Sequence, residues 1–162
     1  MFFDAREENP IRKLDLRPIQ NFASRLGIKI SEKPIKSITE AEQAVGSLPR
    51  NITDGIFFVC SSLFTNLRNI GNTAREKKIP LYACSSLQVA EQGGLLTYAP
   101  DLYYLGYRGA GYISRIFSGT RAGDLPVETP MRYELTVNLN TAKEMGIRIP
   151  PEVLIFADKV IK

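Results

Sequence analysis

The fold is decided between Asp54 and Ser86, where the sequence reads DGIFFVCSSLFTNLRNIGNTAREKKIPLYACSS. Two short apolar runs, 56–60 and 79–84, flank a middle segment with apolar residues at helical spacing: Leu63, Leu67, Ile70 and Ala74. An apolar run, a helix and a second apolar run predict a βαβ unit with buried parallel strands. We therefore expect a domain built on a parallel sheet.

Both apolar runs end on the same chemistry, a cysteine followed by two serines: Cys60-Ser61-Ser62 and Cys84-Ser85-Ser86. A right-handed crossover places the carboxyl ends of the two strands on one edge of the sheet. Ligands of open α/β sheets lie just outside those ends. The four serines are therefore a candidate polar rim for a ligand. Equally, they could all be helix N-caps, because serine is a preferred residue at that position.

The composition narrows the function classes. The 162 residues are 44% hydrophobic and 23% charged, which is typical of one globular domain. The net charge is +4, and the basic residues are scattered among acidic ones, which argues against a nucleic-acid partner. With no histidine and two cysteines, the usual zinc sites and histidine-dependent triads are excluded, so we expect no metal, cofactor or catalytic residue.

The sequence also bears on location. No apolar run reaches the length of a membrane span, which predicts a soluble chain. The start, Met1-Phe2-Phe3-Asp4, lacks the basic segment of a signal peptide.

The region before Asp54 is expected to alternate strands and helices. The first residues resemble the end of a buried strand, and apolar spacing predicts a helix over 14–26, closed by Gly27. Pro18 should weaken that helix unless the helix begins there. We expect a short strand at 28–30, and then a helix that Thr39 caps.

The region after Ser86 continues the alternation. The pattern predicts a helix over 87–92, a strand over 95–98, a long helix opened by Asp101, a strand over 133–139, a short helix over 141–145 and a last helix over 152–161. Such alternation indicates a three-layer α/β sandwich around a mainly parallel sheet. We expect one domain over 1–162. Within it, 102–139 comprises the long helix, which we call the return helix, a connector and the strand over 133–139.

Three stretches carry a resemblance to a known family: KKIPLYACSS, EQGGLLTYAPDLYYLG and AGDLPVETPMRYELTVNLNTAKEMGIRIPPEVLIFADKVI. They resemble the substrate-binding proteins of ABC transporters, whose members include tryptophan- and phenylalanine-binding proteins. The third stretch, residues 122–161, follows the family's tail pattern and is more specific than any short motif here. The start of the chain also looks like the strand that enters the family's second lobe.

The resemblance implies a type I periplasmic-binding fold, in which two α/β lobes close over a solute. This chain would be the C-terminal lobe, and the first lobe, with the family's signal peptide or lipid anchor, would be absent. The implied role is the non-catalytic solute-binding component of an ABC importer, with a membrane permease as partner. The implied location is periplasmic or otherwise extracytoplasmic.

The resemblance also points to site residues. In amino-acid-binding members, the loop after the third strand carries an Asp-Asn pair suited to the ammonium group of the ligand. Ser61 and Ser62 stand at those positions, and a hydroxyl group supplies no negative charge to pair with ammonium. Ser85 and Ser86 match the loop after the fourth strand, and Asp101 matches the aspartate that opens the return helix.

The loop that enters the lobe departs from the family pattern. Arg6, Glu7 and Asn9 stand where family members use small polar residues. Arg6 could bind an acidic solute, or it could be an ordinary exposed loop arginine.

Two other function classes are open. An enzyme could use Asp4, Asp54 and Asp101 with the serines, but Asp54 precedes its strand and lies at the wrong edge of the sheet. The stronger alternative is a non-catalytic regulatory or interaction module derived from a binding-protein lobe, because one lobe without the other cannot enclose a ligand.

Two further expectations concern the thiols and the assembly. Parallel neighbours in register usually have poor disulfide geometry, so we expect Cys60 and Cys84 to be reduced and mostly buried. The aromatic return helix would be uncovered without a first lobe, so we expect a homodimer whose interface comes mostly from Leu102–Leu139, by exchange of that segment.

Overall fold

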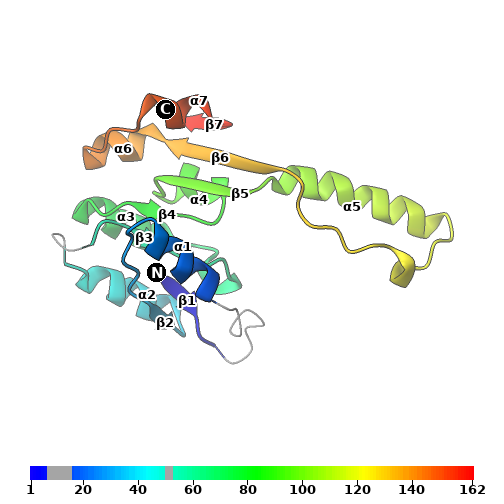
Figure 1. The fold of residues 1–162 in the computed structure, drawn as a ribbon, viewed down its shortest axis with the longest axis horizontal. Helices are drawn as coiled ribbons and strands as arrows, with labels where there is room; N and C mark the ends of the chain where they lie inside the picture. The colour runs from blue at the N-terminus through cyan, green and yellow to red at the C-terminus, as the bar shows by residue number, and fades with distance from the viewer. Residues whose placement is uncertain (7–15, 50–52) are drawn as a thin grey trace.

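The computed structural model describes residues 1–6, 16–49 and 53–162, and Figure 1 shows its fold. The strands are β1 (Phe2–Asp4), β2 (Lys33–Ile35), β3 (Ile56–Phe57), β4 (Leu81–Tyr82), β5 (Leu96–Pro100), β6 (Tyr133–Asn138) and β7 (Lys159–Ile161). Strands β3 to β7 form one sheet in chain order, and β1 pairs with β2. A parallel bridge from Phe2 to Phe58 joins the two sheets.

Every strand pair is parallel except β5–β6, which is antiparallel. This confirms the expected α/β architecture with a mainly parallel sheet. Strands β1, β3, β4 and β5 run in the same direction, so their carboxyl ends lie along one edge. We call this the carboxyl edge. Strand β6 begins at that edge and ends at the other, which we call the opposite edge.

The helices are α1 (Arg17–Arg25), α2 (Ile38–Ser47), α3 (Arg68–Lys77), α4 (Ser86–Glu91), α5 (Leu102–Phe117), α6 (Leu139–Met145) and α7 (Pro151–Ile155), with single 3-10 turns η2 (Ser62–Phe64) and η3 (Ala122–Asp124). Helix α1 begins with Pro18 in its first turn, where the missing N–H costs nothing. None of the described helices combines the length and apolar character that crossing a bilayer requires.

The hydrophobic core lies between the sheet and the pair α2–α3. Three aromatic rings pack together in it: Phe2 and Phe58 are stacked with their centroids 4.9 Å apart, and Phe64 is tilted against Phe58 with the centroids 4.7 Å apart. Ile70 and Ala74 of α3 are buried against the sheet, as their helical spacing predicts. The segment that links β3 and β4 thus supplies part of the core, and it begins at the carboxyl edge.

Helix α5 stands outside this core. In Figure 1 it extends away from the rest of the fold, joined to it by β5 and β6. None of its residues is buried, and Tyr103 and Phe117 are 88% and 87% exposed. The connector between Gly119 and Arg132 turns back along the helix, and Arg108 forms an ion pair with Glu128. We call α5 and this connector the arm.

Four local expectations are wrong. Residues 28–30 are not a strand, because Ile28 N–H closes the end of α1 on Ala23 O at 2.8 Å, and the strand forms at Lys33–Ile35. Ser37 rather than Thr39 caps α2, accepting from Glu40 N–H at 3.1 Å.

The other two corrections concern helix length. The helix expected through Leu63 and Leu67 is interrupted, because Leu67 N–H donates to Gln92 Oε1 at 2.6 Å and α3 starts after it. The last helix ends at Ile155, and β7 follows, because Asp158 N–H donates to Leu135 O at 2.9 Å and draws the chain onto β6.

One glycine fixes how α3 meets the end of α4. A Cβ atom at Gly71 would lie 1.8 Å from Gln92 O, so only glycine permits this approach of the two backbones. We expect Gly71→Ala to lower the free energy of unfolding by roughly 1–3 kcal/mol, because the backbones must separate. Urea denaturation followed by circular dichroism measures this.

Gly106→Ala in α5 is the matched control. A Cβ atom there meets nothing within 4 Å, so the same substitution should leave stability unchanged or raise it by up to about 1 kcal/mol. Equal effects of the two substitutions would contradict the packing argument.

Candidate functional site

Buried Asp4 is the centre of the carboxyl edge. It ends β1, and only 2% of its surface is exposed. Its Oδ1 accepts from the backbone N–H and the Nε of Arg6, at 3.1 and 3.0 Å. Its Oδ2 accepts from Arg6 Nη2 at 2.7 Å and from the Ser61 hydroxyl. The carboxylate therefore links the loop after β1 to the loop after β3.

Arg6 makes a second link between these loops. Its Nη2 donates to Ser62 Oγ at 3.1 Å, and about a quarter of its side chain is exposed. Arg6 is therefore held by contacts on both loops. The structure thus brings Arg6 into contact with Ser62, and Ser61 lies beside them on Asp4.

These contacts set the charge of Asp4. Hydrogen bonds from the Arg6 guanidinium, and to a smaller extent from Ser61, lower the pKa of Asp4 to about 2, although burial of the carboxylate opposes the change. Asp4 is therefore ionised at neutral pH and forms a charge-assisted pair with Arg6.

Two of the four serines are helix caps, so the alternative interpretation, in which all four are caps, holds for only half of them. Ser61 Oγ accepts from Leu63 N–H at 3.0 Å at the start of η2, and Ser85 Oγ accepts from Gln88 N–H at 3.4 Å at the start of α4. Ser86 is the first residue of α4 and is partly exposed. Capping does not remove these hydroxyls from the edge, since Ser61 also donates to Asp4.

The expectation of two reduced, buried thiols is wrong. Cys60 and Cys84 form a disulfide with their Cα atoms 5.5 Å apart, and Cys60 is exposed while Cys84 is half-buried. The geometry is suitable because the bond forms beyond the last paired residues, Phe57 and Tyr82, where the two chains leave strand register. The disulfide joins the loops that carry the two serine pairs.

Asp101 lies at the same edge but is engaged in local structure. Its Oδ1 caps α5 by accepting from Tyr104 N–H at 2.9 Å. Its Oδ2 lies 3.4 Å from Arg132 Nε, across the base of the arm. Asp101 therefore holds the arm, and no contact connects it to the serines in the described structure. Asp54 is exposed and precedes β3, while Glu7 and Asn9 lie outside the described residues.

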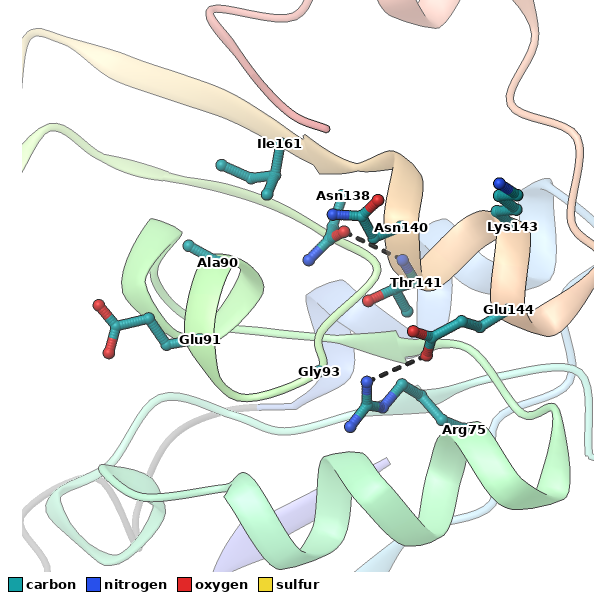
Figure 2. A pocket seen from close by; sticks show the side chains of 10 residues that line it. All are labelled: Arg75, Ala90, Glu91, Gly93, Asn138, Asn140, Thr141, Lys143, Glu144 and Ile161. Atoms are coloured by element: carbon teal, nitrogen blue, oxygen red, sulfur yellow. Dashed lines mark hydrogen bonds and ion pairs between the residues drawn. The ribbon is translucent and has the colours of Figure 1, made fainter.

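A hollow of about 610 Å³ lies at the opposite edge, between α3, α4 and α6 (Figure 2). Its polar walls are tied to one another. Arg75 Nη1 donates to Glu144 Oε2 at 3.0 Å. Buried Asn138 accepts from Thr141 N–H at 3.0 Å and donates to Val89 O at 2.8 Å. These contacts hold α3, α4, α6 and the end of β6 together around the hollow.

Sequence reasoning missed two features of the carboxyl edge. Asp4 was weighed only as part of a catalytic set, although an aspartate that ends an apolar strand two residues before an arginine is a signal for a paired, buried carboxylate. The disulfide was missed because strand register was assumed to continue to the cysteines.

The fold is that of a periplasmic-binding-protein lobe. It superposes on an ABC domain from Streptococcus pneumonia solved in complex with L-Trp, with a TM-score of 0.85 and 22% identity, covering 99% of this chain and 54% of that one. A conserved domain protein from Vibrio cholerae gives a TM-score of 0.81 and 23% identity, over 98% and 53% of the two chains.

The family model described as ABC transporter substrate binding protein matches residues 1–161, so the chain belongs to that family. One relative, the tyrosine-binding protein of Clostridioides difficile (strain R20291), is 26% identical over 137 residues, which are 84% of this chain and 39% of the relative. The chain thus spans about half the length, or less, of the relatives that it matches.

The Asp4 pair should make stability depend on acid. Because the folded pKa of about 2 lies below the ordinary value of 3.8, the stabilisation is complete above about pH 4 and is lost as the pH falls towards 2. Allowing for solvent around Arg6, we expect it to be roughly 1–2 kcal/mol.

Urea unfolding of the wild type and Asp4→Asn between pH 5 and 2 measures this contribution. The difference between them should shrink over that interval, since the variant lacks the titrating group while other carboxylates titrate in both. A difference independent of pH would show that folding does not lower the pKa of Asp4.

Proposed function

We propose that this chain is a solute-binding lobe of an ABC importer, and that a small organic solute, such as an amino acid or an analogue, binds at the carboxyl edge. Membership of the family supports the role, and the family is one of non-catalytic binding proteins. The names of its relatives, one tyrosine-binding and one solved with L-Trp, support an amino-acid-like ligand.

The observation that carries the proposal is the link between Arg6 and Ser62. Arg6 Nη2 donates to Ser62 Oγ at 3.1 Å, so a cationic group and hydroxyls from two different loops converge outside the strand ends. Ser85 and Ser86 continue the same rim on the next loop. Such a rim supplies hydrogen-bond donors and acceptors for a small polar solute.

The state of Asp4 argues against tight binding of a free α-amino group. From the described residues alone, its two oxygens accept four hydrogen bonds, three from Arg6 and one from Ser61, which fill the usual capacity of a carboxylate. Ser61 and Ser62 are uncharged. The edge therefore favours the carboxylate or hydroxyl end of a solute more than its ammonium end.

We expect calorimetry with L-Trp, L-Phe and L-Tyr to give no dissociation constant tighter than the millimolar range, since one lobe offers half of the usual contacts. In an amide NMR titration, the shifts caused by L-Trp should centre on residues 61–63 and 85–88. Ser62→Ala should reduce them.

Asn140→Ala, which removes a polar side chain from the opposite edge, is the matched control and should leave the titration unchanged. A micromolar constant would overturn the argument from the filled Asp4 oxygens. Shifts centred on the hollow of Figure 2 would place the solute site elsewhere.

The same role implies the partners and the location. A substrate-binding protein delivers its solute to a membrane permease, so we propose a permease partner and an extracytoplasmic site of action. A disulfide is compatible with this location, because disulfides persist in oxidising compartments.

The arm supports a second proposal, that two copies associate, which would also suit an interaction module. Its exposed apolar side chains include Tyr103, Tyr107, Ile113, Phe117, Val127 and Met131. Clusters of this kind are normally covered. Exchange of the arms in a two-fold dimer would cover both, with 102–139 supplying most of the interface.

Light scattering at micromolar concentration should therefore give a mass near twice the 18.1 kDa of the monomer. The double variant Tyr103→Ser and Phe117→Ser should shift the mass to that of the monomer. Phe22→Ser, which changes an exposed aromatic residue on α1, should not. A wild-type mass near 18.1 kDa would refute the dimer.

A further inference from the structure

The disulfide lies in the candidate site and outside the hydrophobic core. Cys60 is exposed, and neither cysteine belongs to the core cluster. Each is followed by the serine that begins a helical turn: Ser61 caps η2 and Ser85 caps α4. The disulfide therefore joins the loops after β3 and β4 at the residues just before the caps of η2 and α4.

The backbone ladder stops short of this point. Strands β3 and β4 are paired only at Ile56–Leu81 and Phe57–Tyr82. Beyond them, Val59 N–H donates to Phe2 O at 2.9 Å and Ala83 N–H donates to Leu96 O at 3.1 Å, so the two chains turn towards different neighbours. The covalent bond holds the loops together where the ladder no longer does.

A second tie holds the same loops on their buried side. Gln88, 5% exposed, accepts from Cys84 N–H at 2.9 Å and donates to Phe64 O at 2.6 Å. The core face of the loops is thus held by a buried amide, and the solvent face by the disulfide. Loss of the disulfide would release the solvent face while the core stays packed.

The effect would reach the rest of the rim. Ser61, next to Cys60, donates to Asp4, and Ser62 accepts from Arg6. A shift of the Cys60 loop therefore moves both hydroxyls relative to the Asp4–Arg6 pair. The loops after β1, β3 and β4 are therefore connected to one another. Hydrogen bonds join the first two, and the disulfide joins the second and third.

We propose that the Cys60–Cys84 disulfide positions the solute site, and that its reduction by a dithiol weakens solute binding without unfolding the domain. In the reduction, the Sγ–Sγ bond breaks and each sulfur takes one electron and one proton. The dithiol supplies these two electrons and two protons, and its own sulfurs join in a cyclic disulfide. The inference rests on the proposed function, because it concerns binding at the same edge.

Amide hydrogen exchange on the whole chain tests the positioning without any solute. The N–H groups of Leu63 and Gln88, which the serine caps hold, should exchange about tenfold faster or more after treatment with dithiothreitol. The N–H groups of Ile79 and Val137, in the core and the sheet, should keep their rates. The double variant Cys60→Ala and Cys84→Ala should match the reduced protein and should not respond to dithiothreitol.

The exchange pattern separates positioning from general stabilisation. An equal rise at all four amides would show a disulfide that only stabilises the fold, and no change at Leu63 and Gln88 would show that the loops do not need it. Either result overturns the proposal.

L-Trp, titrated by NMR into the oxidised and reduced chains, tests the effect on binding. The dissociation constant should rise severalfold on reduction, and the same constant in both states would contradict the inference. If L-Trp and the other amino acids bind to neither state, the proposed function fails, while the exchange data still decide whether the disulfide positions the loops.

Discussion

The buried charge of Asp4 is the constraint on which the carboxyl edge depends. A carboxylate that is 2% exposed must be fully hydrogen-bonded, because an unpaired buried charge costs several kcal/mol. The chain satisfies it with Arg6 from the same loop and Ser61 from a loop 57 residues later. The requirement thus fixes how the loops after β1 and β3 meet, and it places the Arg6 cation at the carboxyl edge.

The edge also shows how a lobe with very short strands keeps its loops in place. Strands β3 and β4 are two residues long, so the ladder does little to align the loops at their carboxyl ends. The alignment comes from side chains instead: serine caps, the Gln88 amide, the Asp4–Arg6 pair and the disulfide. Residues that look like ordinary caps in the sequence therefore take part in the site's geometry.

The fold was largely predictable from the sequence because its determinants are local. The spacing of Ile70 and Ala74 identified the core face of α3, and Asp101 was recognised as the start of α5. The short helix predicted to end at 145 does end there, because Gly146 follows in the left-handed conformation. Family resemblance then supplied the arrangement of the lobe, which the matched structures confirm.

The errors arose where tertiary contacts override local pattern. The run after Pro151 reads as a helix, but pairing of Asp158 with Leu135 makes its end a strand. The Gln92 side chain stops the helix expected through Leu63 and Leu67. At the edge, the role of Asp4 depends on Ser61, and the disulfide depends on how two loops leave their strands. The pairing of Asp4 with Arg6 has a local signal in the sequence, but its contact with Ser61 and the disulfide join segments that are far apart in the chain.

The antiparallel pairing of β5 with β6 gives the arm a particular topological status. Pro100 lies opposite Tyr133, and Asp101 N–H donates to Arg132 O at 3.0 Å, so the segment between them is one long hairpin loop closed at its base. Such an excursion can lengthen, shorten or change its surface while the sheet register stays the same. The arm, through which we propose that two copies associate, can therefore diverge separately from the carboxyl edge, where we propose that the solute binds.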